Sequence, residues 1–207
     1  MPLVKRTPNE RDGICERSDA RDCPSLTRQL DDGSAEARRW AARDLLNCPN
    51  CSTDLLARLN EEGDGSVREV ILTTLTRVGD AQAVAGLVTC LRSEDVALRN
   101  EAIEAMKQLP DEVAPIMQDL LHDTSSDMRI FAVNILESLR HPQVEAWLCE
   151  VITQDAHVNV CGAAVDLLSE LGSPAALQPL VQLKRRFPDD PYIQFAADLA
   201  INRLNDD

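Results

Sequence analysis

The chain has 207 residues, of which 44% are hydrophobic and 27% charged, and its 35 Asp and Glu against 21 Lys and Arg give a net charge of −14. So strong an acidic excess argues against binding to a nucleic-acid backbone or to an anionic membrane surface. The hydrophobic fraction is too high for a disordered acidic chain, and no apolar run approaches the roughly 20 residues that span a bilayer. We therefore expect a folded, acidic, cytoplasmic protein.

The first 25 residues differ in composition from the rest. They carry five basic and five acidic residues with no apolar stretch between them. This pattern predicts a charged, disordered N-terminal extension over residues 1–25, with no secretory signal, followed by one folded domain over residues 26–207. The seven cysteines, an odd number, are expected to be free thiols in a reducing cytoplasm.

A repeat of about 30 residues runs through this domain. One column, at spacings of 30, 31, 30, 32 and 33, holds Arg38, Arg68, Arg99, Arg129, Cys161 and Gln194. Apolar or small residues recur at offsets −1, +3, +7 and +10 from the column, and these offsets lie on one face of an α-helix. The +3 column holds Ala41, Ile71, Ala102, Ala132, Ala164 and Ala197.

A second apolar set lies between these helices. It comprises Leu55, Leu56 and Leu59; Leu87, Val88 and Leu91; Ile116, Met117 and Leu120; Trp147, Leu148 and Val151; Leu180, Val181 and Leu183. Each repeat is therefore predicted to be a helical hairpin. Because a single hairpin cannot cover its own apolar face, the hairpins must stack. The sequence predicts an all-α fold, an α-solenoid of about six stacked hairpins over residues 26–204.

The repeat resembles a known family. A Val67-Arg68 opening, a small residue at offset +3 and a Val78-Gly79-Asp80 closing are similar to HEAT repeats. The short period resembles the bacterial HEAT-like subtype named after phycobilisome lyases. The resemblance implies a HEAT-like superhelix, and it leaves function open among scaffolds, adaptors, bilin lyases and chaperone-like proteins.

The arginine column is expected to be structural. Arg38, Arg68, Arg99 and Arg129 are predicted to form a ladder between adjacent repeats. Their expected partners are the acidic neighbours Asp64, Asp95 and Asp127, since guanidinium groups pair bidentately with carboxylates. The alternative is an anion-binding groove.

A partner-binding surface is expected on the concave face, which offsets +1, +5 and +8 line in HEAT-like arrays. The candidates at or beside these offsets are Trp40, Glu69, Asn100, Glu104, Ile130, Phe131, Asn134 and Asp166. An exposed Ile130 beside Phe131 would give an apolar anchor within a polar rim. The expected partner is a protein with a basic or mixed apolar and polar surface. The alternative is that Phe131 and Trp40 only pack between repeats.

The cysteines offer weaker candidates. Cys48 and Cys51 form a CxxC motif, with Cys15 and Cys23 upstream, that could bind a metal or cycle as a dithiol. Cys48 stands in an apolar column, which favours a packing role and no metal. Cys161 occupies the arginine column at a helix start, where a lowered thiol pKa would make it reactive; the alternative is a substitution specific to that repeat.

No established catalytic motif is present. The histidines His122, His141 and His157 lack the His-Glu pairs of the HEAT-like deoxyhypusine hydroxylases, and GxGxxG, GxxxxGK[ST], HExxH and GxSxG are absent. We therefore expect no cofactor, and the sequence favours a protein that is not an enzyme.

The leading functional hypothesis is a non-enzymatic scaffold, adaptor or regulator that docks a protein partner. The first alternative is a bilin-lyase-like chaperone or enzyme, against which the 6 aromatic residues offer little surface for stacking a tetrapyrrole. The second is a CxxC redox or metal-binding protein. A HEAT-like DNA glycosylase is disfavoured by the acidic charge.

Overall fold

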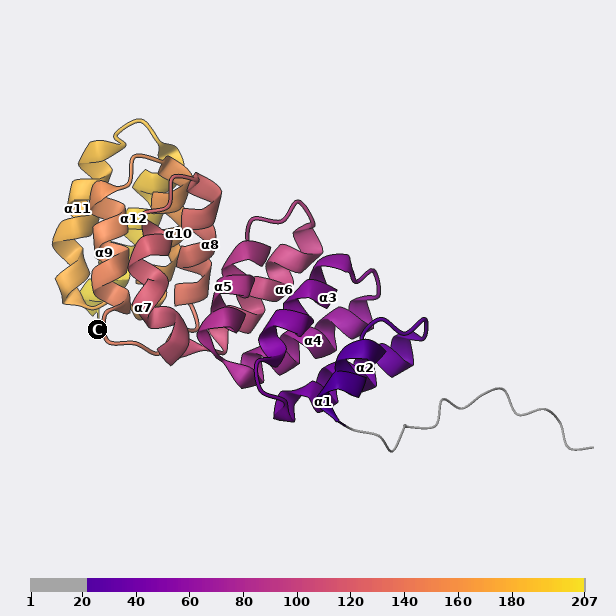
Figure 1. Cartoon of the computed structure of the whole chain (residues 1–207). Coiled ribbons are helices and arrows are strands. Elements are labelled where there is room, and N and C mark those ends of the chain that lie inside the picture. The colour runs from indigo at the N-terminus through magenta and orange to yellow at the C-terminus, as the bar shows by residue number, and fades with distance from the viewer. Residues whose placement is uncertain (1–21, 207) are drawn as a thin grey trace, which may run out of the picture. The chain divides into compact units, whose positions relative to one another are not determined.

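The computed structural model of the chain describes residues 22–206, and these residues form helices joined by short loops (Figure 1). The twelve α-helices in this range are α1 (Cys23–Gln29), α2 (Ala35–Asp44), α3 (Cys51–Glu61), α4 (Gly65–Val78), α5 (Ala81–Cys90), α6 (Val96–Lys107), α7 (Pro110–Leu121), α8 (Ser126–Leu136), α9 (Val144–Gln154), α10 (Val158–Leu171), α11 (Leu177–Arg186) and α12 (Pro191–Asp206). Two 3-10 helices span Leu45–Asn47 and Pro174–Ala176. The predicted all-α fold of six stacked hairpins is confirmed.

The chain divides into two compact units, Met1–Thr74 and Leu75–Asp207. The predicted extension over residues 1–25 falls largely outside the described residues, and α1 already begins at Cys23. Within residues 22–206, no helix is both long and apolar enough to cross a membrane.

In the unit Leu75–Asp207 the helices form two layers. The even-numbered helices α6, α8, α10 and α12 pack side by side in one, which we call the even-helix layer. Their hairpin partners form the other layer, the odd-helix layer, where α5 contacts α7 and α9 contacts α11 (Figure 1).

The +3 column explains how the even-numbered helices approach one another. Ala102, Ala132, Ala164 and Ala197 are all 0% exposed. A methyl group at this position fills the contact without separating the backbones, whereas a larger or charged side chain would force them apart. Leu171, at offset +10, departs from the predicted stripe because it is the last residue of α10 and is 39% exposed.

Most loops end in a side chain that caps the next helix. The Asp80 carboxylate accepts a hydrogen bond from the Ala83 N–H at 2.7 Å, and the Asp95 carboxylate accepts one from the Ala97 N–H at 2.8 Å. These carboxylates satisfy amide groups that have no partner inside the helix.

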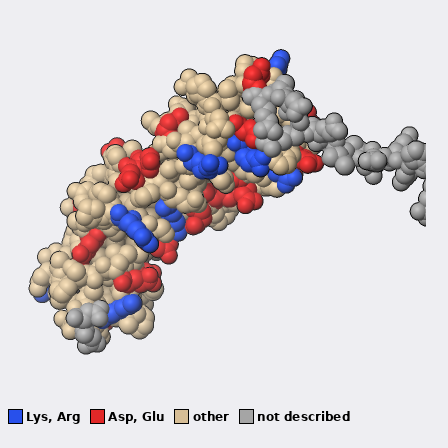
Figure 2. All heavy atoms as spheres, turned by 90° about the horizontal axis from the view of Figure 1, so that it is seen from below, with Lys and Arg blue, Asp and Glu red and all other residues tan. Residues whose placement is uncertain are grey.

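On the face seen in Figure 2, basic side chains lie among acidic ones.

Candidate functional site

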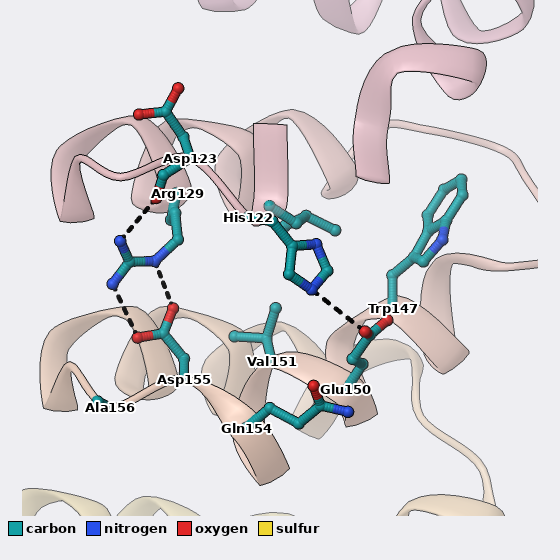
Figure 3. Close-up of a pocket in the computed structure, with 10 residues that line it drawn as sticks. His122, Asp123, Arg129, Trp147, Glu150, Val151, Gln154, Asp155 and Ala156 are labelled. Atoms are coloured by element: carbon teal, nitrogen blue, oxygen red, sulfur yellow. Dashed lines mark hydrogen bonds and ion pairs between the residues drawn. The ribbon is translucent and has the colours of Figure 1, made fainter. Parts of the chain in front are cut away.

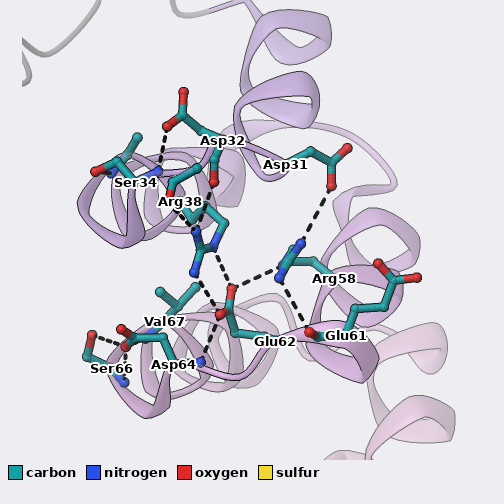
Figure 4. Close-up of polar contacts among 12 residues, drawn as sticks. Asp31, Asp32, Ser34, Arg38, Arg58, Glu61, Glu62, Asp64, Ser66 and Val67 are labelled. Carbon is teal, nitrogen blue, oxygen red and sulfur yellow. Dashed lines mark hydrogen bonds and ion pairs between the residues drawn. The ribbon is translucent and has the colours of Figure 1, made fainter.

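Arg38 is held by contacts of the kind that a structural ladder requires (Figure 4). Its Nε and Nη2 atoms donate to the Glu62 carboxylate at 2.7 and 2.8 Å, and its Nη1 donates to the Asp32 carbonyl at 2.9 Å. Glu62 is buried, which acts to raise its pKa, but hydrogen bonds from Arg38 and from the Asp64 N–H outweigh burial and hold that pKa below its usual value.

Arg129 repeats the arrangement in the second unit. Its Nε and Nη2 donate to the Asp155 carboxylate at 2.6 and 2.9 Å, and its Nη1 donates to the Asp123 carbonyl at 2.9 Å. Arg99 Nη1 donates to the Ser93 carbonyl at 2.6 Å, and Arg68 is half-buried. The ladder role of these four arginines stays a prediction. The Arg38–Glu62 and Arg129–Asp155 contacts join adjacent repeats.

The carboxylates that pair with Arg38 and Arg129 are not among the acidic neighbours named from the sequence. Asp64 accepts hydrogen bonds from the Ser66 and Val67 N–H groups, Asp95 caps α6, and Asp127 is exposed in the first turn of α8. Glu62 and Asp155 are the carboxylates that pair with Arg38 and Arg129, and each lies in the loop before the next repeat's second helix. The carboxylates of Asp64 and Asp95 accept hydrogen bonds from amide groups at the start of the helix that follows.

In the fifth repeat, Arg186 takes over the role of the ladder arginine. Cys161 occupies the column there, and its thiol donates to the Asp155 carbonyl at 3.3 Å. Arg186, from α11, donates to the carbonyls of Ile152 and Asp155. Burial raises the pKa of Cys161, so the expectation of a lowered thiol pKa at a helix start is wrong.

The two cysteines of the CxxC motif do not pair with each other. Cys23 and Cys48 form a disulfide with their Cα atoms 5.7 Å apart, while Cys51 is a buried free thiol. The expectation that all cysteines are free thiols is corrected, because the turn after α1 returns the chain to the end of the first 3-10 helix. Cys15 lies outside the described residues. Within residues 22–206, no group of three or more His, Cys, Asp or Glu side chains is arranged to hold a metal ion.

The predicted partner face is distributed over both units. Trp40 and Glu69 lie in Met1–Thr74, where the Arg43 guanidinium stands 4.2 Å from the Trp40 ring centroid. Ile130 and Phe131 are half-buried, so Ile130 is not the fully exposed anchor that we expected. Asn100, Glu104, Asn134 and Asp166 are exposed on the even-helix layer. Partner binding by these residues stays a prediction.

A small pocket of mixed lining lies between α7, α8 and α9 (Figure 3). It has a volume of about 260 Å³, and the Arg129–Asp155 pair forms one wall. At its mouth His122 Nε2 stands 3.3 Å from the Glu150 carboxylate, and the Trp147 ring stacks on His141 with centroids 5.1 Å apart. Its volume falls below the roughly 300 Å³ at which ligand pockets begin, and its arginine is already paired.

A larger, apolar groove lies between α5 and α7 in the odd-helix layer. Its volume is about 640 Å³, and it is lined by Gly79, Ala81, Val84, Ala85, Val88, Glu112, Pro115, Ile116, Asp119 and Leu120. The walls are aliphatic, and two carboxylates stand among them. A groove of this size is in the range of small-molecule sites.

The groove forms because each helix has more apolar residues than one face can bury. In α5, Leu87 is 0% exposed and Val88 next to it is half-buried; in α7, Met117 is 0% exposed and Ile116 is half-buried. The doubled apolar positions were the sequence signal of this groove, but we assigned them to the core.

Gly79 closes one end of the groove. It adopts φ +58°, which an L side chain rarely takes, and its N–H donates to the Leu75 carbonyl at 2.9 Å. A Cβ here would stand 3.3 Å from Leu109 and 3.5 Å from the Glu112 carboxylate. The turn therefore lets Glu112 lie against the backbone at this end.

Comparison with known proteins adds a family and a relative. A family model described as HEAT repeats matches residues 52–129 and 113–202. Bilin biosynthesis protein PecE of Mastigocladus laminosus is 29% identical over 160 residues, which make up 75% of this chain and 59% of PecE. The aligned part of the chain thus spans well under two thirds of the length of this relative.

Two solved structures are among the matches. The complex of CpcE and CpcF of phycocyanin lyase from Nostoc sp. PCC7120 matches with a TM-score of 0.38 and 16% identity, over 98% of this chain and 100% of that chain. The archaeal HEAT-like repeats protein from Thermococcus onnurineus NA1 matches with a TM-score of 0.46 and 14% identity, over 89% and 87%. Likeness at these TM-scores carries no inference about function.

Proposed function

The chain belongs to the HEAT repeat family, and from that premise we propose that it is a phycobilin lyase-type subunit, which holds an open-chain tetrapyrrole while it is attached to an acceptor protein. The observation that carries this proposal is the 29% identity to bilin biosynthesis protein PecE over 75% of the chain. Attachment of a bilin needs an acceptor, so a protein partner is part of the proposal.

The similarity to PecE also overturns our leading hypothesis from the sequence. The expectation of a non-enzymatic scaffold or adaptor was wrong, and the bilin-lyase-like alternative is favoured in its place. We had set the scarcity of aromatic residues against a tetrapyrrole. The α5–α7 groove has aliphatic walls, and apolar contact with a conjugated ring system does not require stacking.

We place the tetrapyrrole in the α5–α7 groove. Its volume of about 640 Å³ accommodates a small molecule, whereas the pocket beside Arg129 has about 260 Å³. A bilin is apolar on its faces, with pyrrole N–H donors on one edge and propionate groups on the other. Val84, Val88 and Ile116 offer apolar walls for the faces, while Glu112 and Asp119 are acceptors for the N–H groups.

The groove lining also limits the chemistry of this chain. Among the groove residues there is no Cys, Ser or His that could attack the bilin. The nucleophile must therefore come from the acceptor protein. The role we assign to this chain is to bind the tetrapyrrole, fix its conformation and shield it from water, which favours a productive encounter with the acceptor thiol.

A titration of the full chain with biliverdin, followed by visible absorbance, tests the proposal. We expect a red-shifted, saturable band for the wild type and at least a tenfold loss of affinity for Val88→Asp. Val181 stands at the equivalent place in the last repeat, is also half-buried and lies outside the groove, so Val181→Asp is the matched control and should bind like the wild type. No saturable band with the wild type would overturn the proposed function, and equal binding by Val88→Asp would overturn the placement in the groove.

A further inference from the structure

The last repeat exposes an apolar stripe on the even-helix layer. Tyr192, Phe195 and Leu199 of α12 are 51%, 67% and 53% exposed. Their spacing of three and four residues puts them on one face of the helix. Three large apolar side chains side by side are unusual on a protein surface that faces only water.

The stripe is a property of this repeat alone among the even-numbered helices of its unit. At the positions of Phe195 and Leu199, α6 has Asn100 and Glu104, which are both exposed. At those positions α8 has Ile130 and Asn134, and α10 has Gly162 and Asp166. Contiguous apolar patches on a protein surface mark sites of interaction. The stripe on α12 therefore indicates a surface that a partner covers.

One residue of the stripe is fixed in place before any partner arrives. The Tyr192 hydroxyl donates to the Asp166 carboxylate, with its oxygen 2.6 and 2.5 Å from the two carboxylate oxygens. This hydrogen bond, together with partial burial, raises the pKa of Tyr192 to about 12. The ring lies against Gly162, where a Cβ would stand 3.1 Å from Tyr192 Cε1. A preorganised ring loses little entropy when a partner binds.

The surroundings of the stripe are acidic on the side of α10. Asp166 lies there beside Glu137 and Glu170 in the lining of a hollow of about 240 Å³ between α8 and α10. The cation Lys107 is already paired with Glu104 at 3.1 Å and with Glu137 at 2.8 Å. On α12 itself, Asp198 pairs with Lys184. The α10 side therefore offers the negative charge of Asp166 and Glu170 to a partner.

The other end of the stripe has the opposite sign. Arg203 stands four residues after Leu199 and is exposed in the last turn of α12. A partner that covers the whole stripe would meet both the α10 carboxylates and this guanidinium.

We propose that Tyr192, Phe195 and Leu199, with the acidic hollow beside them, form a docking surface for an amphipathic helix of another protein. That helix presents a stripe of apolar side chains to α12 and lysine or arginine side chains to Asp166 and Glu170. A second copy of this chain does not fit, because a chain with a net charge of −14 would bring carboxylates toward carboxylates. This proposal depends on the exposed side chains of α12 and the carboxylates of α10, and it does not depend on tetrapyrrole binding in the α5–α7 groove.

Two labelled synthetic helices of about five turns provide the probe. Both carry leucines at i, i+3, i+4 and i+7; one carries lysines along a single edge and the other carries glutamates there. Fluorescence anisotropy with the full chain should show at least tenfold tighter binding of the lysine helix. Asp166→Asn should weaken that binding severalfold and reduce its dependence on salt concentration.

The matched variants place the binding on α12. The double variant Phe195→Asp with Leu199→Asp should lose at least tenfold in affinity for the lysine helix. Val96 is an equally exposed apolar residue, 57% exposed at the start of α6, so Val96→Asp should bind like the wild type. Far-ultraviolet circular dichroism checks that the variants are folded.

Four results would overturn the proposal: no binding of the lysine helix, equal binding of the glutamate helix, unchanged binding by the double variant, or sedimentation showing a wild-type dimer that the double variant loses.

Discussion

The α5–α7 groove and the α12 stripe are both apolar, but they differ in shape and in where their charges lie. The groove is concave, with a volume of about 640 Å³, and its carboxylates Glu112 and Asp119 stand among aliphatic walls. The stripe projects from one helix, and its charges lie beside it on α10. A small molecule gains from walls on several sides, whereas a helix gains from a long open face. The odd-helix layer thus suits a ligand, and the even-helix layer suits a partner.

Both surfaces depend on the close packing of the even-numbered helices, and Ala132→Asp tests that packing. Ala132 is 0% exposed, so the substitution buries a charge without a partner and should cost about 4 kcal/mol of folding free energy. Both binding activities should be lost together. Ala97→Asp, at an exposed position in α6, is the control. Thermal unfolding of Ala132→Asp at the wild-type temperature would show that the register is wrong.

Cys23→Ser should affect the other unit and neither surface. The disulfide from Cys23 to Cys48 closes a loop with a sequence separation of 25, and its loss should destabilise Met1–Thr74 by about 3 kcal/mol. Biliverdin and helix binding should not change, since both surfaces lie in Leu75–Asp207. Thermal unfolding with and without reductant measures the effect, and the wild type should respond to reductant while Cys23→Ser should not.

Asp155→Asn separates packing from binding within the second unit. The Asp155 carboxylate forms an ion pair with Arg129. Burial acts to raise the pKa of Asp155, but the hydrogen bonds from Arg129 and from the His157 N–H outweigh it and hold that pKa below its usual value. The stabilisation is therefore complete above the ordinary carboxyl pKa of about 4 and is lost as pH falls through the lower folded value. We expect a loss of about 2 kcal/mol at pH 7.

The pH profile supplies the check on Asp155→Asn. Wild-type stability should fall below pH 4 by more than that of the variant. Parallel profiles would show that the Arg129–Asp155 contact does not contribute to stability in solution. Affinity for biliverdin at pH 7 should be unchanged, because Asp155 is not a groove residue.

The variants that change stability least should distinguish the two binding surfaces most clearly. Val88→Asp should lower biliverdin affinity at least tenfold, about 1.4 kcal/mol, and leave binding of the lysine helix unchanged. Phe195→Asp should do the reverse. Both sites are partly solvated, so the free energy of unfolding should change by about 0.5 kcal/mol or less. If Val88→Asp or Phe195→Asp weakened both activities while the protein stayed folded, the two surfaces would not be independent.

The periodic features were predictable from sequence, and the features that break the period were not. The column at Arg38, the apolar offsets and the alanines at +3 predicted the hairpins because each repeat restates them. The partners Glu62 and Asp155 were missed because we considered only the acidic neighbours Asp64, Asp95 and Asp127. Arg186 was missed because it reaches the carbonyl of Asp155 from a different helix, so its position carries no periodic signal.

The groove and the stripe were missed for opposite reasons. Val88 and Ile116 are apolar residues next to core residues, so a sequence pattern cannot tell a groove wall from the core. Phe195 and Leu199 stand at the offsets that we assigned to the partner face, but we chose Ile130 as the anchor there. Ile130 is half-buried, and the exposed apolar side chains Phe195 and Leu199 lie two repeats further along the chain, in α12.

Visible circular dichroism of biliverdin with the full chain tests the central claim most directly, because a free bilin has no net optical activity and one held in a protein groove acquires it. We predict a dichroic band for the wild type that persists with excess lysine helix, is lost in Val88→Asp and remains in Val181→Asp. The absence of a band in the wild type, or its loss in Phe195→Asp but not in Val88→Asp, would contradict a tetrapyrrole-binding groove between α5 and α7.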